Sequence, residues 1–297
     1  MPQYRDLTLV VIGALLVSTK GILVKLLYQE GVTTEASLLL RAWISVPMIW
    51  WWAYYRNGVR DVLSAPPNLI AGAMLAGVTC YYLAAWLNFI ALTMIDASLE
   101  RVLLFSYPIF VVIVRAISTR QLPSPRVCTA VVLIYLGIVL AVGGLDMSLW
   151  QKNRLGAMLV LLAACGFTYY LFANERYAVR AGSIGFIVYA MSAASIALLI
   201  HFLSFNDLAE LNISLLAWGY LLLMTAFTYV LPLFLFSEGI RRIGAQRAAI
   251  LSTVGPPATI FLSAYLLGET MTWIQIVGSV LIVAGIVVVE YRVKLVS

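Results

Sequence analysis

Four charged side chains stand inside runs of apolar residues, where surrounding lipid would make each of them costly. Glu100 and Arg101 are adjacent in the stretch DASLERVLLFSYP (96–108), and Lys20 and Arg41 lie within two earlier apolar runs. An ionisable side chain near the centre of a membrane helix costs about 2.5–3.5 kcal/mol on insertion scales, so such residues usually face a bundle interior or a water-filled cavity. All four are therefore candidates for contact with a charged solute.

The chemistry of these four groups favours an anion. Three cations stand against one carboxylate, and Arg binds a carboxylate in bidentate fashion while Lys acts as a point charge. Lys20 and Arg101 are the first candidates for anion contact. Adjacent helical residues point about 100° apart, so we expect Glu100 to pair with Arg41 or Lys20 of a neighbouring helix. Glu100 is also the candidate for carrying a coupling proton.

Each charge also has a structural interpretation. Arg41 lies near the start of its apolar run, where it would equally fasten helices together or extend its guanidinium to the membrane interface. Glu100 and Arg101 would equally serve as structural pairing partners, or stand outside the lipid if their helix begins later. The sequence alone leaves these alternatives open.

Aromatic and hydroxyl side chains at helical spacing form a second group of candidates. Thr79, Tyr82 and Trp86 are spaced i, i+3 and i+7, which places them on one face of an α-helix. Two further pairs have i, i+4 spacing: Tyr170 with Asn174, and Thr225 with Tyr229. Such faces either line a cavity with hydroxyl and indole donors or serve ordinary packing.

The amino-acid composition indicates the class of protein in which these residues lie. Of 297 residues, 63% are hydrophobic and 11% are charged, and the mean hydropathy is +0.99, which lies outside the range of soluble globular domains. Apolar runs of about 20 residues, each long enough to cross the roughly 30 Å hydrocarbon layer, recur along the chain. The sequence therefore predicts an all-α membrane protein with ten transmembrane helices. The predicted spans are 7–27, 35–55, 69–92, 96–115, 126–144, 155–174, 183–203, 214–237, 244–266 and 273–291.

The distribution of basic residues predicts the orientation of the chain. With a cytoplasmic N-terminus, 13 of the 19 Lys and Arg residues fall in cytoplasmic segments. They are Arg5, Arg56, Arg60, Arg115, Arg120, Arg126, Arg176, Arg180, Arg241, Arg242, Arg247, Arg292 and Lys294. Cytoplasmic loops carry such an excess in membrane proteins. We therefore expect both termini in the cytoplasm, and we interpret the net charge of +6 as a signal of orientation.

The chain repeats itself at an offset of 148 residues. The segments VLIYLGIV (132–139) and VLIVAGIV (280–287) agree at six of eight positions, and the same offset aligns 95–108 with 243–256. Since 148 is close to half the length, residues 1–146 and 147–297 are predicted as two copies of five helices each. An odd number of crossings inverts the second copy in the membrane, an arrangement in which many secondary transporters hold a substrate near the midplane.

These segments also resemble a known family. The tail LLGETMTWIQIVGSVLIVAGIVVV (266–289) and the stretch from Ala97 to Pro108 resemble the EamA-like exporters of the drug/metabolite transporter superfamily. The resemblance implies two EamA-like five-helix repeats around a central cavity, and export of small metabolites such as amino acids across the bacterial inner membrane. The first copy departs from the pattern, because Arg120-Gln121 replace the Gly268-Glu269 of the second.

We therefore expect an inner-membrane secondary transporter that exports a small carboxylate-bearing metabolite by alternating access. The cargo would be an amino acid or an amino-acid-derived metallophore. The alternative is a broad-specificity exporter of aromatic or cationic drugs, in which Tyr and Trp side chains dominate and the cations brace the bundle. The predicted substrate-binding residues are Lys20, Arg41, Tyr82, Trp86, Glu100, Arg101, Tyr170 and Tyr229.

Other classes of function are disfavoured by the motifs. The single histidine, His201, excludes a two-histidine zinc motif, the three cysteines lack paired spacing, and no P-loop or G-x-S-x-G segment occurs. Without a nucleotide-binding module, transport would be driven by the cargo gradient, by exchange or by an ion. We expect no enzymatic activity, no cofactor, no metal and no nucleic-acid or protein partner, but only a small-molecule substrate and membrane lipid.

Overall fold

The computed structural model describes residues 2–57, 62, 65–92, 94–95, 103–141, 154–267 and 272–290. Regular structure in these ranges is helical throughout, with no strand, which confirms the predicted all-α class. A helix satisfies its own backbone polar groups, and a segment surrounded by lipid has no water with which to satisfy them. The apolar runs of this chain take that form.

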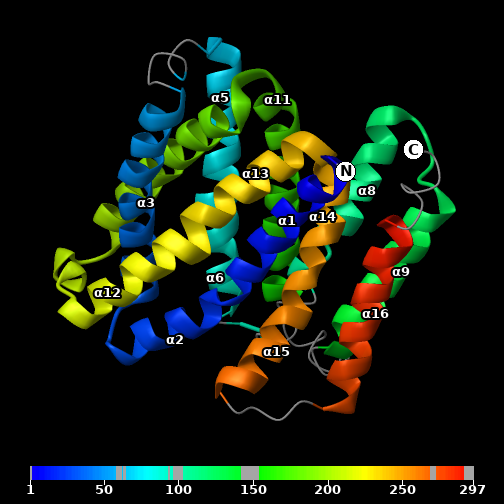
Figure 1. Ribbon diagram of the computed structural model, residues 1–297. Coiled ribbons are helices and arrows are strands. Elements are labelled where there is room, and N and C mark those ends of the chain that lie inside the picture. Colours follow the sequence, from blue (N-terminus) through cyan, green and yellow to red (C-terminus); the bar gives the residue numbers. More distant parts are fainter. Residues whose placement is uncertain are drawn as a thin grey trace. The chain divides into compact units, whose positions relative to one another are not determined.

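Helices lie within each of the predicted spans (Figure 1). They are α1 (Pro2–Ser18), α2 (Lys20–Gln29), α3 (Thr34–Asn57), α5 (Pro67–Gly77), the π-helical η1 (Val78–Ala84), α6 (Ala85–Leu92), α8 (Tyr107–Thr119), α9 (Pro125–Ala141), α11 (Arg154–Phe205), the 3₁₀ turn η2 (Leu208–Leu211), α12 (Leu215–Leu223), the π-helical η3 (Met224–Val230), α13 (Leu231–Ile243), α14 (Ala245–Leu251), the 3₁₀ turn η4 (Ser252–Val254), α15 (Gly255–Leu267) and α16 (Trp273–Glu290).

Four described segments are long and apolar enough to cross a membrane. They are Pro67–Asn88, Arg154–Arg180, Gly182–Phe205 and Leu215–Ile243. Shorter apolar helices occupy Asp6–Ser18, Tyr107–Thr119, Pro125–Ala141 and Trp273–Val288. The number of ten membrane crossings stays a prediction.

The span predicted at 7–27 differs from the structure, because α1 and α2 are separated at Thr19. Two hydroxyl groups bond to backbone carbonyls at this point: Ser18 Oγ donates to Ala14 O at 2.8 Å, and Thr19 Oγ1 donates to Leu16 O at 2.7 Å. Such bonds bend a helix or interrupt it. The break directly precedes Lys20, the first residue of α2.

A glycine divides α11 into the two separate helices that the sequence predicts. Gly182 has φ 76° and ψ 154°, outside the helical region. A residue with a Cβ atom adopts positive φ at a steric cost that glycine avoids. The chain therefore turns at Gly182, between the predicted spans 155–174 and 183–203.

The chain forms two compact units, and each combines segments from both predicted sequence copies. The first unit comprises Met1–Leu83 and Tyr169–Gly244, and the second comprises Ala84–Thr168 and Ala245–Ser297. The division into copies at 1–146 and 147–297 concerns the sequence repeat and stays a prediction.

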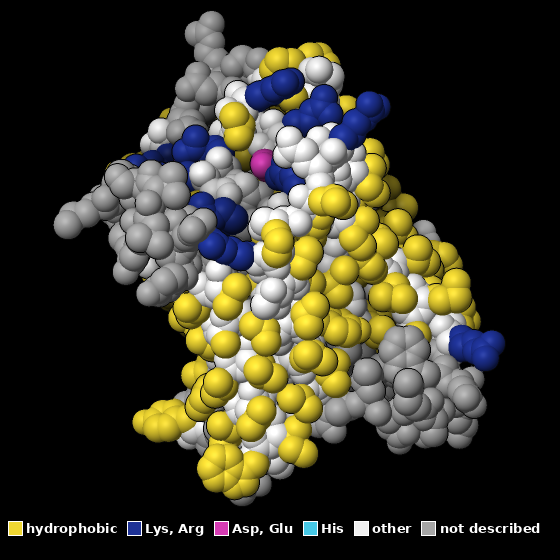
Figure 2. Space-filling view, turned by 90° about the vertical axis from the view of Figure 1, so that its right-hand side faces the viewer, with side chains coloured by type: hydrophobic (Ala, Val, Ile, Leu, Met, Phe, Trp, Pro, Cys, Tyr) yellow, Lys and Arg dark blue, Asp and Glu magenta, His cyan; other side chains and the backbone are white. Residues whose placement is uncertain are grey.

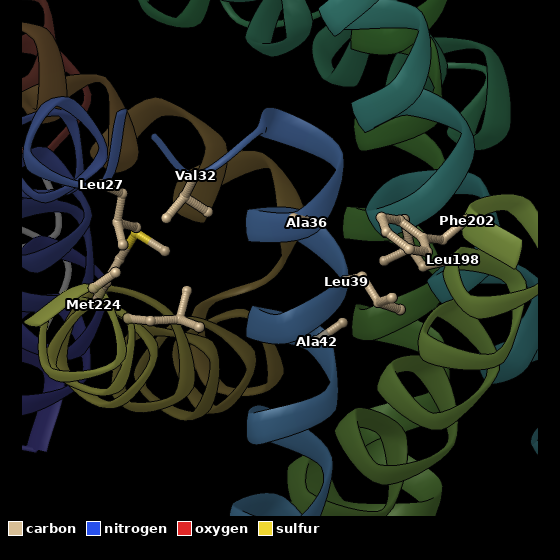
Figure 3. Close-up of a cluster of buried hydrophobic side chains, with 10 residues drawn as sticks. Leu27, Val32, Ala36, Leu39, Ala42, Leu198, Phe202 and Met224 are labelled. Carbon is tan, nitrogen blue, oxygen red and sulfur yellow. The ribbon is translucent and has the colours of Figure 1, made fainter. Parts of the chain in front are cut away.

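In the first unit, buried apolar side chains join α3 to its neighbours (Figure 3). Ala36, Leu39 and Ala42 of α3 belong to one cluster with Leu198 and Phe202 of α11. Other members come from α2, α12 and η3 and from Val32, which lies between α2 and α3. This packing holds α3, the helix that carries Arg41, against the helices around it.

In the second unit, α9 and α16 lie in contact along their lengths (Figure 1). A Cβ atom on Gly137 would lie 2.6 Å from Gly278 O, and one on Gly285 would lie 2.9 Å from Ala130 O. Residues nearer the start of α9 therefore contact residues nearer the end of α16, so the two helices are antiparallel. Gly137 and Gly285 are equivalent at the 148-residue offset. Antiparallel packing of equivalent helices is what an inverted repeat requires.

An ion-pair network in the first unit joins the beginning of α1 to the end of α13. Arg242 Nη1 lies 2.8 Å from Asp6 Oδ1, and its Nε lies 2.6 Å from Glu238 Oε1. Ser183 Oγ, at the start of the second part of α11, donates to Glu238 Oε2 at 2.6 Å. Exposed ion pairs contribute only about 0–1 kcal/mol each. The network therefore links these three chain segments but adds little to the stability of the unit.

The surface of the described residues is rich in apolar side chains. Figure 2 shows hydrophobic side chains over much of one face. Over the described residues as a whole, large exposed apolar side chains include Trp51, Tyr55, Leu215, Tyr265 and Trp273. A soluble monomer rarely exposes so much contiguous apolar surface. Helices that face lipid require it, which agrees with a membrane protein.

Substituting Gly77 tests the contact between α5 and α11. A Cβ atom on Gly77 would lie 1.9 Å from the carbonyl oxygen of Ala190, so Gly77→Ala must push the two helices apart. Overpacking of this kind costs about 1–3 kcal/mol. We expect a lower midpoint of thermal unfolding for the purified variant.

Gly219→Ala is the matched control in the same unit. Nothing lies within 4 Å of the Cβ position at Gly219, and Ala in a helix is favoured over Gly by about 0.8–1.0 kcal/mol. Its midpoint should equal or exceed that of the wild type. Equal midpoints for the two variants would contradict the close contact at Gly77.

Candidate functional site

A buried cation lies at the centre of the candidate site in the first unit. Arg41 of α3 is 7% exposed, and its Cζ lies 4.2 Å from the centroid of the Tyr229 ring. A guanidinium over an aromatic face is attracted by the ring quadrupole, most strongly when both groups are out of water. Among the residues that the structure describes, no acceptor is bonded to Arg41 Nε. The side chain therefore keeps a hydrogen-bond donor that a bound group could use.

Three tyrosine rings continue from Arg41 in edge-to-face contact, and we call them the tyrosine row. The Tyr229 and Tyr81 centroids are 5.9 Å apart with an interplanar angle of 84°, and the Tyr81 and Tyr170 centroids are 5.0 Å apart at 77°. Tyr229 also donates its hydroxyl to Met191 Sδ at 3.6 Å. Edge-to-face pairs at these distances are favourable and hold each ring in one orientation.

Two members of the row occupy π-helical turns at equivalent positions of the sequence repeat. Tyr81 lies in η1 and Tyr229 lies in η3, and the two residues are 148 positions apart. A π-helical turn has hydrogen bonds between residues i and i+5; it is rare and frequently occurs at functional sites. The two copies therefore bring matching tyrosines, on matching irregular turns, into direct contact.

Tyr82 and Trp86, two of the predicted substrate contacts, lie outside the tyrosine row. The hydroxyl of Tyr82 lies 3.2 Å from His201 Nδ1, while the adjacent Tyr81 joins the row. The spacing argument assumed an α-helix, but η1 is π-helical, which changes the residue that faces a given neighbour. Trp86 lies in α6, in the second unit, and is 39% exposed.

Two threonines of the predicted cavity-facing groups, Thr79 and Thr225, donate their hydroxyl protons to backbone carbonyls of the preceding helical turn. Thr79 Oγ1 donates to Leu75 O at 2.9 Å, and Thr225 Oγ1 donates to Leu221 O at 2.7 Å. Neither hydroxyl proton is available to a bound group in this arrangement.

Asn174 follows Tyr170 by one helical turn and is fully buried, with 0% exposure. Its Oδ1 accepts a hydrogen bond from Ser237 Oγ of α13 at 2.9 Å. The amide interacts with the Tyr170 hydroxyl, but its Nδ2 forms no well-aligned hydrogen bond among the residues described here. The site thus contains a second buried donor in addition to Arg41 Nε.

The remaining predicted site residues fall where the structure gives no side-chain description. Lys20 is the first residue of α2, but its side chain lies outside the described atoms, and Glu100 and Arg101 lie outside the described residues. The structure therefore brings together Arg41, Tyr170 and Tyr229 of the predicted set.

Sequence reasoning missed Tyr81 and Ser237. The signal for Tyr81 was present in the repeat, because the 148-residue offset pairs it with Tyr229. Ser237 gave no such signal, since its partner Asn174 is 63 residues away in sequence.

The chemistry of these groups suits an organic anion. A guanidinium binds a carboxylate, an amide donor binds a carbonyl or carboxylate oxygen, and tyrosine rings contact apolar atoms. No cluster of three or more His, Cys, Asp or Glu side chains able to hold a metal ion occurs in the described part of the chain.

Comparison with known proteins shows what the chain is related to. The EamA-like transporter family matches residues 154–291. The chain is 35% identical to the "Uncharacterized transporter YcbK" of Bacillus subtilis over 287 residues, which is 95% of this chain and 91% of that protein. It is 20% identical over 182 residues to the "Uncharacterized transporter YyaM" of the same organism, covering 60% of this chain and 59% of that one.

A solved crystal structure supports the fold. It superposes with a TM-score of 0.82 at 15% sequence identity and covers 98% of this chain and 99% of its own. At that identity the likeness concerns the fold alone. The relative at 35% identity extends over nearly the whole chain, and the family match covers the second sequence copy. This chain therefore belongs to the EamA-like transporter family of the drug/metabolite transporter superfamily, and it is a multi-pass membrane transporter.

Proposed function

We propose that this protein exports a small carboxylate-bearing metabolite, an amino acid or an amino-acid-derived metallophore, by alternating access. The observation that carries the proposal is the Arg41 guanidinium, which is buried on the Tyr229 ring and has no acceptor for Nε among the described residues. A buried charge is costly unless it is paired and hydrogen-bonded. The two oxygens of a carboxylate supply both a charge and the missing acceptor.

Export of aromatic or cationic drugs is the alternative function. The tyrosine row would suit a flat or cationic ring, but Arg41 contacts that row directly. Two like charges 4 Å apart repel by about 4 kcal/mol at an effective dielectric constant of 20. A cationic cargo at the row would meet this repulsion, so the geometry favours an anionic or zwitterionic cargo.

Further roles in this proposal come from the sequence. Lys20 and Arg101 are proposed as additional anion contacts, Glu100 as the carrier of a coupling proton, and Trp86 as a contact for apolar parts of the cargo. These assignments rest on charged or aromatic side chains within apolar runs.

We also propose that the protein resides in the bacterial inner membrane with both termini in the cytoplasm. The relatives YcbK and YyaM are bacterial, and the basic residues are concentrated in the segments that this orientation places inside.

Metabolite profiling of a strain that lacks the gene tests the function. One anionic metabolite should accumulate in the cells, and wild-type protein should restore its release. Arg41→Gln should lower the release rate by about 10- to 100-fold, because a hydrogen bond to a charged group contributes about 1.5–3 kcal/mol. Arg180→Gln, which changes an exposed arginine of α11, is the control and should restore release. Full release with Arg41→Gln would contradict the role of Arg41.

Adjacent tyrosines provide a second test of the site. Tyr81→Leu removes two edge-to-face contacts in the row, each contributing about 0.5–1.5 kcal/mol, so release should fall by roughly tenfold. Tyr82→Leu removes the contacts with His201 but leaves the tyrosine row intact, so it should have a smaller effect per folded molecule. A larger loss with Tyr82→Leu would mean that the cargo uses the face predicted from α-helical spacing.

Alkaline phosphatase fusions test the orientation, because this reporter is active only outside the cytoplasm. A fusion after Asp207 should be active, and fusions after Arg120 and after Ser297 should be inactive, as the positive-inside rule predicts. Activity after Ser297 would overturn the predicted placement of the C-terminus.

A further inference from the structure

We propose that Asn174 is a second specificity-determining contact, which selects cargo that carries another acceptor group, such as a second carboxylate, in addition to the one bound by Arg41. The inference rests on the proposed function, because it assigns the substrate class of the same site.

Ser237 fixes the orientation of the Asn174 amide. Ser237 Oγ donates to Asn174 Oδ1 at 2.9 Å, and both residues are 0% exposed. The carbonyl end of the amide is thereby held toward α13. The amide interacts with the Tyr170 hydroxyl, but its Nδ2 end forms no well-aligned hydrogen bond in the described part of the chain. A buried donor left without a full hydrogen bond is destabilising. An acceptor on the cargo would remove that cost.

The Asn174 amide lies next to the tyrosine row. Tyr170 and Asn174 are four residues apart on α11, so they lie on the same face of the helix. The Tyr170 ring contacts Tyr81, Tyr81 contacts Tyr229, and Tyr229 contacts Arg41. Two buried donors without a well-aligned hydrogen bond among the described residues, Arg41 Nε and Asn174 Nδ2, therefore lie at the two ends of the tyrosine row.

Arg41 and Asn174, at the two ends of the tyrosine row, bind different chemical groups. Arg41 is a permanent cation and requires an anion for full compensation. The Asn174 amide is neutral and donates to any carbonyl or carboxylate oxygen. A cargo with a single carboxylate would pair with Arg41 and leave Asn174 unpaired. Sites with buried polar groups discriminate strongly against analogues that leave such groups unpaired. A cargo with two acceptor groups is therefore preferred.

A purely structural role for Asn174 makes a different prediction. If the bond to Ser237 only braces α11 against α13, removing it would lower stability and weaken the binding of every ligand by the same factor. A role in specificity instead changes the ratio between ligands that differ in the second acceptor. The ratio is therefore the quantity to measure.

The experiment uses the full-length protein in lipid nanodiscs. The probes are straight-chain dicarboxylic acids of four to eight carbons and the monocarboxylic acids of the same lengths. Thermal unfolding midpoints at increasing probe concentration give the Kd of each acid, since a ligand that binds only the folded state stabilises it by mass action. We expect one dicarboxylate to bind about tenfold more tightly than its monocarboxylate partner. Asn174→Leu should abolish this ratio and leave the Kd of the monocarboxylate unchanged.

Two further variants separate the possible failures. Arg41→Gln should weaken the binding of both series, whereas Ser237→Ala should lower only the ratio, because the amide is then free to rotate. If Asn174→Leu does not fold, the change in this ratio for Ser237→Ala tests the role of Asn174 instead. Unchanged binding of both series to Arg41→Gln would overturn the proposed function. If Arg41→Gln weakens both series but the ratio is absent in the wild type, or survives in Asn174→Leu, the inference about Asn174 fails alone.

Discussion

Helices in a bilayer gain little by covering apolar surface with one another, because lipid tails are as apolar as leucine, so their association depends on close packing. Both units of this protein meet that constraint through glycine. Gly77 brings α5 against the backbone of α11 at Ala190, and Gly137 and Gly278 bring α9 against α16. At each of these positions a single Cβ atom would lie within 3 Å of a backbone atom of the neighbouring helix.

The same close contact positions the candidate site. Gly77 is the last residue of α5, and the π-helical turn that carries Tyr81 begins at the next residue. On the other side of the contact, Met191 follows Ala190 and accepts a hydrogen bond from the Tyr229 hydroxyl. The residues that pack α5 against α11 are therefore adjacent in sequence to the residues that orient the tyrosine row. A substitution that moved α5 away from α11 would also move the row.

The two sequence copies agree in backbone geometry and differ in chemistry. Equivalent glycines lie at the α9–α16 contact, and equivalent tyrosines meet on the two π-helical turns. The position equivalent to Arg41 is Tyr189, whose hydroxyl donates to Val62 O. Packing constrains the backbone in both copies, whereas only one copy supplies this buried cation. The candidate site is therefore asymmetric, although the sequence is internally repeated.

Several features of this protein were determined by the sequence alone. Apolar runs of membrane length can only be helices in lipid, which gave the all-α class, and the closing motif indicated the family. Arg41 could be identified as a site candidate because a charge in such a run needs a partner, and Tyr170 and Tyr229 because of their i, i+4 spacing with other polar residues. The break at Thr19, the choice of Tyr81 over Tyr82 and the Asn174–Ser237 bond required the tertiary structure. The first two depend on departures from α-helical geometry, and the third joins residues far apart in the chain. Helical periodicity predicts neither irregular helical turns nor contacts between distant residues, because it describes only how neighbours along one regular helix are arranged.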